Sequence, residues 1–302
     1  MNQYPIPEPH WYDGIQGRFL RLAAGGLVPA RWFLPDLPER AALTAKTGRL
    51  HIEIVSHCWN YAHMQAYQLS SLVLFAPRDV DITMTVFYGA EDLQTVALLD
   101  FFAEQKVPGV TWNWQQLPRQ ALFRRAIGRN LAARQTRADW VWFTDCDLLF
   151  RDNCLDALAA ALQGRQDSLV FPASEYCTGL LPPDAALLAP PLSPPEVVDV
   201  DVALFSRFDK DRATGPLQIT HGDIARAVGY CESLPYYQRP SATWCKAYED
   251  RAFRWLLRTQ GEPVDVPGVF RIRHVAKGRY TGSALNTGVR SGLRRAVAKL
   301  RG

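Results

Sequence analysis

The regular alternation of strand and helix patterns in the first half of the chain constrains its fold more than any other feature. Leu50–Val55 alternates and then becomes apolar, Asp81–Tyr88 is rich in β-branched and aromatic residues, and Val110–Trp114 is a shorter segment of similar type. Helical patterns over residues 60–75 and 92–105 separate these three segments. Strands that alternate with helices predict an α/β fold with a doubly wound, mostly parallel sheet flanked by helices. Ligands of such sheets bind beyond the carboxyl ends of the strands.

The chain is predicted to form one domain between two dissimilar ends. With 302 residues, of which 48% are hydrophobic, it is long enough for one large core. Residues 1–48 are rich in proline and aromatic side chains, which predicts an irregular N-terminal extension packed on the body. We assign residues 49–280 to the domain and 281–302 to a basic C-terminal tail. Pro182–Pro195, with six of the 21 prolines, predicts a surface loop.

Cysteine usage and targeting patterns indicate the compartment. The six cysteines show no Cys-x-x-Cys spacing, which favours free thiols in a reducing cytosol over disulfides or a structural zinc site. The first residues lack a basic region followed by an apolar one, so no secretory signal is expected. No apolar run approaches the roughly 20 residues that span a bilayer. We therefore expect a cytoplasmic protein.

Positive charge gathers towards the C-terminus. Residues 266–302 contain nine Lys or Arg and no acidic residue, whereas the remainder of the chain is more acidic than basic. Within them, Leu293, Ala296, Val297 and Leu300 have the spacing of one helical face. Such a helix either packs on the body or lies on an anionic membrane surface, which would hold the protein peripherally on the inner face of the membrane. No recognised nucleic-acid-binding module accompanies these charges, so no nucleic-acid partner is expected.

Two carboxylates follow the apolar strand pattern of residues 139–144. An extended backbone places the side chains of Asp145 and Asp147 on one face. Their charges repel each other unless a cation lies beside them, and Mg²⁺ and Mn²⁺ prefer oxygen ligands and often bridge to diphosphates. The same spacing recurs at Asp199 and Asp201, which lack such a strand before them and rank far below the first pair.

An amphipathic helix is predicted over residues 121–134, just before this strand. Asn130 falls inside its apolar stripe, four residues after Ala126. An asparagine on the buried side of a helix must find hydrogen-bond partners. Two interpretations remain open: Asn130 is a satisfied core amide, or Arg129 and Asn130 face a bound nucleotide.

Three motifs of the chain occur together in a known family. They are an Arg-Asn pair on a helix, an Ala-Asp-x-x-x-x-x-Asp-x-Asp strand end and a Glu-Asp pair that opens a later helix, at Arg129-Asn130, residues 138–147 and Glu249-Asp250. Over residues 49–280 the chain resembles glycosyltransferases of the GT-A type, particularly family 2 and its relatives. Residues 220–232 are similar to the family's stretch ending Gly-Gly-Tyr-Asp-Glu. The spacing from Trp244 to the Glu-Asp pair departs from the family's Trp-Gly-x-Glu-Asp, so the acceptor pocket is expected to differ.

The resemblance implies a donor site at the end of the apolar strand. It implies a nucleoside diphosphate sugar as donor and Mn²⁺ or Mg²⁺ as cofactor. Asp145 would lie near the ribose and the metal, and Asp147 would bind the metal. Arg129 and Asn130 would lie near the nucleotide.

The Glu-Asp pair has both a catalytic and a structural interpretation. The resemblance implies that Asp250 is the general base that takes a proton from the acceptor hydroxyl, a step to which a positioned carboxylate is suited. Glu249 would orient or bind the acceptor. In the structural interpretation, both acids only complement the helix dipole in the first turn of their helix.

A late histidine and two bases complete the implied donor site. The strand pattern Val269–Arg273 places Phe270 and His274 on one face. The family often supplies a metal-binding histidine here, and a structural role is the alternative. Lys277 and Arg279 follow and could neutralise the leaving diphosphate.

Two further positions are donor-site candidates. Ser56 and His57 end the first strand, where the family contacts the nucleobase. Asp92 follows the second strand, where a family acid often touches the uracil or ribose. The alternative for Asp92 is the N-cap of the next helix.

The function predicted from the sequence is metal-dependent transfer of a sugar from a nucleoside diphosphate sugar. A UDP-sugar is the expected donor, a hydroxyl of a glycan or of a lipid-linked molecule the expected acceptor, and inversion the expected stereochemistry. One alternative is a nucleotide-sugar-binding protein without turnover. Another is an aspartate-based phosphotransferase, which typically has its Asp-x-Asp on the first strand with a threonine two residues later. Here Leu149 takes that place and at least three strands precede the motif.

Overall fold

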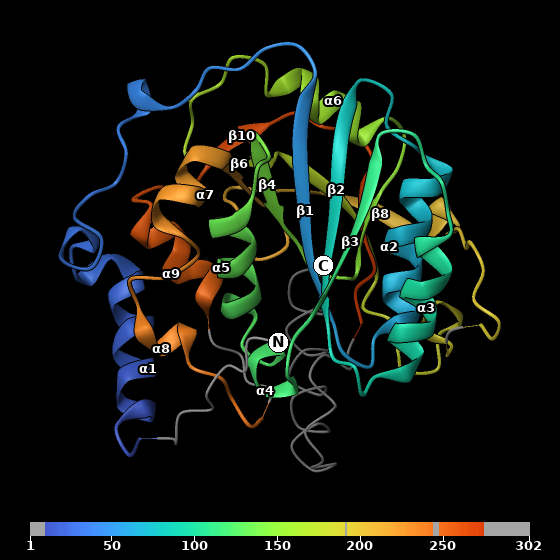
Figure 1. Cartoon of the computed structure of the whole chain (residues 1–302), viewed down its shortest axis with the longest axis horizontal. Coiled ribbons are helices and arrows are strands. Elements are labelled where there is room, and N and C mark those ends of the chain that lie inside the picture. The colour runs from blue at the N-terminus through green and yellow to red at the C-terminus, as the bar shows by residue number, and fades with distance from the viewer. Residues whose placement is uncertain (1–9, 191, 244–247, 275–302) are drawn as a thin grey trace.

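The central sheet has seven strands and is mostly parallel. In the computed structural model, which describes residues 10–190, 192–243 and 248–274, the strand order is β10-β6-β9-β4-β1-β2-β3 (Figure 1). All pairings are parallel except those of β9 with β4 and β6. The strands are β1 (Leu50–Cys58), β2 (Val80–Tyr88), β3 (Val110–Gln116), β4 (Trp140–Phe143), β6 (Leu169–Pro172), β9 (Gln218–His221) and β10 (Glu262–Val264). The predicted α/β fold class is confirmed.

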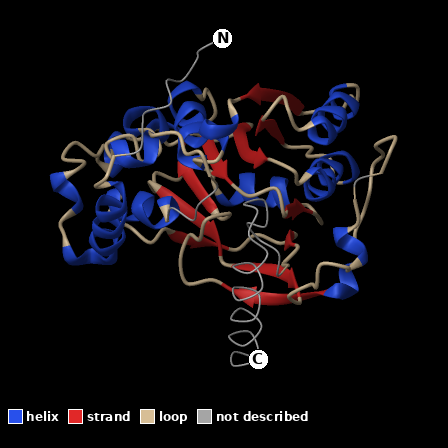
Figure 2. Cartoon of the chain, turned by 90° about the horizontal axis from the view of Figure 1, so that it is seen from below, coloured by secondary structure: helices blue, strands red, loops and turns tan. Residues whose placement is uncertain are grey.

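Helices lie on both sides of this sheet. α2 (Ala62–Leu74) and α3 (Leu93–Ala103) lie on one side, and α5 (Arg125–Gln135), α7 (Gly222–Val228) and α9 (Glu249–Leu256) on the other (Figure 1). Seen from below, the strands form a middle layer between the helices (Figure 2). The shorter helices are α4 (Arg119–Leu122), α6 (Cys154–Ala161) and α8 (Pro235–Gln238). The structure confirms the helices predicted over residues 60–75 and 92–105 to within two residues.

A second, smaller sheet brings the end of the described chain to the Asp-x-Asp. Its order is β5-β11-β7-β8, with β5 (Leu148–Phe150), β7 (Ser174–Thr178), β8 (Phe205–Asp209) and β11 (Val269–Arg271). β11 runs antiparallel to β5, which directly follows Asp147. Phe270 and His274 are both buried, as the predicted alternation requires, although the regular strand already ends at Arg271.

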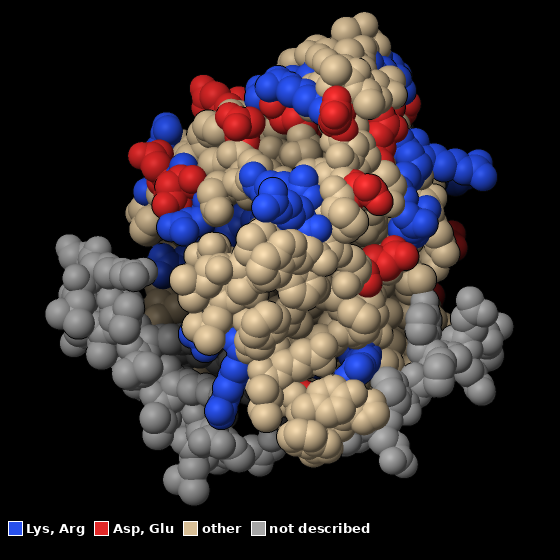
Figure 3. Space-filling model, turned by 90° about the vertical axis from the view of Figure 1, so that its left-hand side faces the viewer, with Lys and Arg blue, Asp and Glu red and all other residues tan. Residues whose placement is uncertain are grey.

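The prediction of an irregular segment over residues 1–48 is wrong where α1 (Asp13–Leu22) forms. Two glycines lower the intrinsic helix propensity of this segment, so the contacts of the helix with the body stabilise it. Asp13 pairs with Arg239 at 2.8 Å, and Leu20 is buried. Further along, the Trp255 indole N–H donates to the carbonyl of Val28 at 2.9 Å. The extension is therefore packed on the body as expected, on the side of the molecule that Figure 3 faces.

The single helix predicted over residues 121–134 is divided into α4 and α5. Arg124, at φ −110° and ψ 82°, is not helical. In this conformation its side chain donates to the carbonyl of Arg239 at 3.2 Å and lies over the Tyr236 ring. The division therefore follows from contacts with a segment more than a hundred residues away.

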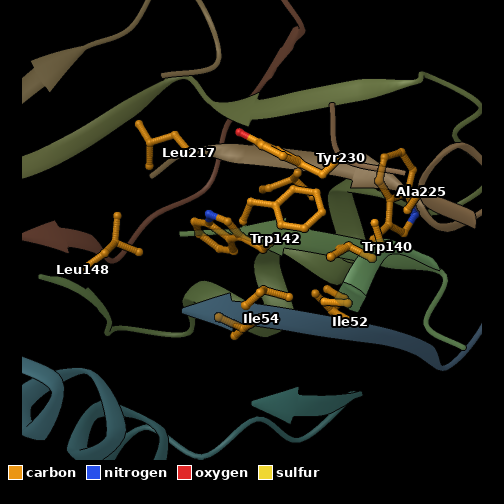
Figure 4. Close-up of a cluster of buried hydrophobic side chains, with 14 of the residues drawn as sticks. Ile52, Ile54, Trp140, Trp142, Leu148, Leu217, Ala225 and Tyr230 are labelled. Atoms are coloured by element: carbon orange, nitrogen blue, oxygen red, sulfur yellow. The ribbon is translucent and has the colours of Figure 1, made fainter. Parts of the chain in front are cut away.

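Two buried tryptophans fix the strand that leads to the Asp-x-Asp. Trp140 and Trp142 of β4 lie in one apolar cluster with Ile54 of β1 and with Tyr230 (Figure 4). The buried Trp142 indole N–H donates to the carbonyl of Pro216 at 2.9 Å, so this polar atom is satisfied. Burying a side chain of this size contributes about 2–3 kcal/mol, which holds the end of β4 in place.

The remaining predictions on organisation have mixed outcomes. Within Pro182–Pro195 the described residues form only a short 3₁₀ turn, Ala186–Leu188, which agrees with a loop. Among the described cysteines, Cys58, Cys154, Cys177 and Cys231 are free thiols. Among the described helices, none is both long and apolar enough to cross a membrane. Lys277, Arg279 and the tail 281–302 lie outside the described residues.

Candidate active site

Two arginines of α5 hold the first aspartate of the Asp-x-Asp. Asp145 follows β4, and its Oδ1 accepts a 2.5 Å bond from Nη1 of Arg125. Arg129, one helical turn further along α5, places Nη2 at 3.4 Å from the same oxygen. The helix before the strand and the carboxylate after it are thus joined by charge-assisted contacts.

Arg129 acts as a buried support for the loop. Its side chain is 0% exposed, and Nη1 donates to the Tyr230 hydroxyl at 2.9 Å. Nη2 also approaches the carbonyl oxygens of Thr144 at 3.1 Å and Gly215 at 3.3 Å. A buried cation is tolerated where it is both paired and hydrogen-bonded. Arg129 therefore positions the Asp-x-Asp from the core side and is itself buried.

Asn130 is half-buried and forms a hydrogen bond of the kind that the core-amide interpretation requires. Its Oδ1 accepts from the backbone N–H of Tyr230 at 2.8 Å. The same oxygen lies so close to Gly229, at φ +64°, that a Cβ there would come within 2.2 Å of it. The amide thus ties α5 to the turn after α7.

Sequence reasoning missed Arg125, which links the two acidic motifs. Its Nε lies 3.2 Å from Oε1 of Glu249, while Nη1 binds Asp145. Burial alone would lower the pKa of Arg125, but the charges of Asp145, Glu249 and Asp250 outweigh it and raise the pKa. The signal was available: Arg125 precedes Arg129 by one helical turn, so both side chains lie on one helix face.

The two acids that begin α9 differ in burial and in contacts. Glu249 is 3% exposed, and its Oε2 has no hydrogen-bond partner among the described residues. Asp250 is half-buried, and a Cβ added to Gly215 would lie 3.5 Å from its Oδ2. Because Arg129 binds the carbonyl of Gly215, Asp250 lies beside the loop that Arg129 supports. Both acids also occupy the first turn of the helix, as the structural interpretation requires.

The second sheet brings the segment before His274 to Asp147. The backbone N–H of Ile272 donates to the carbonyl of Asp147 at 2.9 Å, next to the antiparallel pairing of β11 with β5. His274 lies two residues further on, in a parallel bridge with Leu181. Asp147 and His274 are both buried, with exposures of 4% and 2%.

The donor set fits a divalent ion that shares its coordination with a substrate. Carboxylates and an imidazole are ligands that Mn²⁺ accepts, and Mg²⁺ is usually held by one or two carboxylates together with substrate phosphates. In the described part of the chain, no three His, Cys, Asp or Glu side chains form a group that could hold a metal by themselves. Arg125 and Arg129 already hold the Asp145 carboxylate.

His57 lies next to the arginine pair at the end of β1. Its ring stacks on Phe87 of β2, with ring centroids 5.1 Å apart. Neither ring nitrogen has a hydrogen-bond partner in the part of the chain that the structure describes. Burial and the positive charges of Arg129 and Arg125 lower its pKa well below the ordinary value. The imidazole is therefore neutral at physiological pH, with one donor and one acceptor nitrogen.

The other two donor-site candidates have structural partners. Ser56 is buried and donates weakly to Oε1 of Gln65 at 3.4 Å. Asp92 caps α3, because its carboxylate accepts from the backbone N–H and the hydroxyl of Thr95. It also accepts from the N–H of Asn60 at 2.5 Å, in the loop after β1. The N-cap interpretation of Asp92 is confirmed.

Gly128→Ala tests the packing of His57 against α5. A Cβ at this position would lie 2.3 Å from Nε2 of His57 and 3.0 Å from the Phe87 ring. The gain in helix propensity, about 1 kcal/mol, opposes an overpacking cost of about 1–3 kcal/mol. We expect a net loss of up to about 2 kcal/mol in urea unfolding. Gly179→Ala, with nothing within 4 Å, is the control. If Gly128→Ala is at least as stable as wild type, the His57 side chain is not packed tightly against α5.

Comparisons with known proteins give one family-model match and several structural similarities at low sequence identity. The glycosyl transferase family 2 model matches residues 103–186. A mannosyltransferase, PcManGT from Pyrobaculum calidifontis in complex with GDP-Man and Mn²⁺, is 19% identical over 89% of this chain and 70% of its own, with a TM-score of 0.44. S. aureus TarS 1-349 in complex with UDP-GlcNAc is 13% identical over 78% of this chain and 62% of its own, with a TM-score of 0.45. None of the curated proteins matches the chain.

The family match covers the central part of the site described above. Residues 103–186 run from the end of α3 through α5 and β4 to the strands after the Asp-x-Asp. They contain Arg125, Arg129, Asp145 and Asp147 but not the acidic pair of α9. The resemblance to glycosyltransferase family 2 is thereby confirmed over residues 103–186, and the match supports a glycosyltransferase.

Proposed function

We propose that this glycosyltransferase depends on a divalent metal and moves a sugar from a nucleoside diphosphate sugar, with a UDP-sugar as the expected donor. The acceptor is a hydroxyl, and the anomeric configuration is inverted. The observation that carries the proposal is the contact of Arg125 with both Asp145 and Glu249. It joins the motif assigned to the donor with the motif assigned to the acceptor in one charged network.

The donor half of the site would use the residues around the end of β4. Asp147, with Asp145 and His274, would hold Mn²⁺ or Mg²⁺, which supplies positive charge to the diphosphate. The neutral ring of His57, beside Ser56, would contact the nucleobase, because its two nitrogens lack partners in the described residues.

The other donor residues would act less directly. Arg129 and Asn130 would support this half from the core through their hydrogen bonds to Tyr230. Asp92 would act by holding the backbone of the loop after β1 through Asn60. Lys277 and Arg279, outside the described residues, stay predicted contacts of the diphosphate.

The acceptor half would use the two acids of α9 in different roles. Glu249 forms an ion pair with Arg125, so it would orient the acceptor. Asp250 forms no ion pair within the described ranges and would take the proton of the acceptor hydroxyl. The acceptor oxygen forms its bond to the anomeric carbon from the side opposite the diphosphate. The bond from that carbon to the diphosphate oxygen breaks, and the diphosphate leaves with the electron pair. Positioning and electrostatic stabilisation supply most of the rate enhancement.

The structure disfavours the phosphotransferase alternative. Three strands of the central sheet, β1 to β3, precede β4 along the chain, so the Asp-x-Asp does not follow the first strand. Leu149, where a phosphotransferase would carry threonine, is 2% exposed in the second sheet. A protein that binds nucleotide sugars without turnover remains the second candidate, and a turnover assay decides between the two.

The proposal also includes the type of acceptor and the cellular location of the enzyme. A glycan or a lipid-linked molecule would present the hydroxyl, in the cytoplasm. Whether the basic tail holds the protein on an anionic membrane stays a prediction, because residues 281–302 lie outside the described residues.

A thermal-shift screen with nucleoside diphosphate sugars, with and without Mn²⁺, tests the donor and metal together. A ligand that binds the native state raises the melting temperature by mass action. For wild type we expect a larger shift with UDP-sugar plus Mn²⁺ than with either alone. Asp147→Asn removes a charged ligand, and we expect it to keep the melting temperature of the free protein but lose the metal-dependent part of the shift.

The control for this screen is Asp199→Asn, the same chemical change in the second Asp-x-Asp. It should leave the shift intact, because Asp199 pairs with Arg151 on the surface. An Asp147→Asn variant with the metal dependence of wild type would show that the ion is held elsewhere. If GDP-sugars raise the melting temperature and UDP-sugars do not, the nucleobase of the donor is guanine and not uracil.

A further inference from the structure

An apolar surface lies on the N-terminal segment, away from the site. Seven of the thirteen large hydrophobic side chains that are exposed in the described residues belong to residues 11–32. The most exposed are Trp11 at 87%, Leu27 at 77% and Trp32 at 70%. We call the seven the N-terminal apolar face: Trp11, Tyr12, Ile15, Phe19, Leu22, Leu27 and Trp32. A concentration of this kind on a folded surface marks an interaction site.

Three residues of the face belong to a helix that is already anchored by its other side. Ile15, Phe19 and Leu22 recur at i, i+4 and i+7, which is one face of α1. The other side buries Leu20 and pairs Asp13 with Arg239. Because α1 already packs on the body through its opposite side, its orientation is fixed and the exposed stripe faces solvent.

Between residues 10 and 35, the charged side chains are basic except for Asp13. Arg18, Arg21 and Arg31 are exposed and form no ion pair among the described residues. Arg21 lies over the Tyr248 ring, 4.4 Å from its centroid. The one acid of α1, Asp13, is neutralised by Arg239. Figure 3 faces this side of the molecule, where uncharged surface is bordered by Lys and Arg side chains and, on part of its edge, by Asp and Glu side chains.

We propose that the N-terminal apolar face docks on an anionic lipid membrane. Tryptophan and tyrosine prefer the interface between headgroups and acyl chains, and an amphipathic helix with basic borders lies in that plane. The arginines complement the negative headgroups. A second copy of the chain fits less well, because a two-fold interface would bring the same unpaired arginines of both copies together.

This docking would orient the enzyme. α1 packs on α8 and α9, and Arg21 contacts Tyr248, the residue directly before Glu249. The acidic pair assigned to the acceptor therefore lies on the side of the molecule that would face the lipid. The inference goes beyond the proposed function and does not depend on it, since lipid binding needs neither donor nor turnover. It also concerns a different element from the basic tail.

Vesicle co-sedimentation of the full chain tests the proposal. The probes are vesicles of phosphatidylcholine mixed with phosphatidylserine and vesicles of phosphatidylcholine alone, at low and high salt. We expect wild type to pellet with the anionic vesicles. The triple variant Ile15→Gln, Phe19→Gln, Leu22→Gln should lose about tenfold or more in partitioning. The pair Arg18→Gln, Arg31→Gln should lose about fivefold per arginine at low salt and less at high salt.

The matched control makes the same changes elsewhere. Leu74, Leu93 and Leu204 are also exposed, at 46%, 75% and 49%. Replacing all three with glutamine should leave pelleting unchanged, and the donor-induced thermal shift of every variant should stay that of wild type. Equal pelleting of the Ile15/Phe19/Leu22 variant and wild type would overturn the proposal, as would a wild type that binds no vesicle. Self-association of wild type without lipid, abolished by the triple variant, would assign the face to a second copy instead.

Discussion

Asp250→Asn is expected to lower the turnover number by a factor on the order of 10²–10⁴ while donor affinity stays unchanged. The amide cannot accept the proton of the acceptor hydroxyl, and Asp250 is the acid of the pair without an ion pair in the described residues. The measurement is initial-rate kinetics with the donor identified in the thermal-shift screen, together with calorimetric titration of that donor. The expected pattern is a loss in the turnover number with little change in the donor dissociation constant.

Glu249→Gln separates the two roles of the acidic pair. Losing its charge weakens the contact with Arg125, so we expect a change in acceptor or donor affinity along with a smaller loss of rate. Asp211→Asn, a change in an exposed ion pair with Arg212, is the control and should be silent. If Asp250→Asn retains more than about a third of wild-type turnover while Glu249→Gln loses most of it, the base is Glu249.

Local patterns predicted four strands of the central sheet, β1 to β4, and missed β6, β9 and β10. β1 and β2 begin and end within a few residues of the predicted strands, because each alternates at first and then continues into apolar or β-branched residues. The same logic located Asp145 and Asp147 beyond a strand end. Alternation also placed Phe270 and His274 on one face, and both are buried although β11 itself ends at Arg271.

Features decided by distant contacts were not predictable in this way. The break between α4 and α5 depends on Arg124 reaching the carbonyl of Arg239, and α1 depends on its packing against a segment more than two hundred residues later. Asn130 shows the same limit: its position in the apolar stripe predicted a need for partners, but only the fold reveals that Tyr230 supplies one.

Identifying the role of Arg125 requires both its spacing in the sequence and the packing of helices in the fold. Its spacing from Arg129 places the two side chains on one helix face, but the contact with Glu249 requires α9 to pack against α5. This contact joins residues 124 positions apart. The family model ends at residue 186, so it does not reach the acidic pair either. A charged residue on the same helix face as a candidate binding residue is therefore a candidate itself, whichever motif the family names.

Arg129→Met is expected to lower the free energy of unfolding by about 3–5 kcal/mol. The side chain is 0% exposed, and its removal leaves the Tyr230 hydroxyl and the carbonyls of Thr144 and Gly215 without this donor. Each buried polar group left unsatisfied costs about 1–3 kcal/mol, and methionine recovers part of the packing but none of the hydrogen bonds. Urea unfolding followed by tryptophan fluorescence measures the change, since Trp142 lies in the adjoining core.

The comparison with Arg134→Met identifies the cause of that loss. Arg134 lies on the same helix, but its ion pair with Glu232 is about half exposed on both sides, so its loss should cost less than about 1 kcal/mol. Arg129→Lys keeps the charge but not the planar fork, so we expect an intermediate loss. If Arg129→Met and Arg134→Met are equally mild, Arg129 does not support the Asp-x-Asp loop. In that case its place beside Asp145 has to be explained by direct contact with the donor instead.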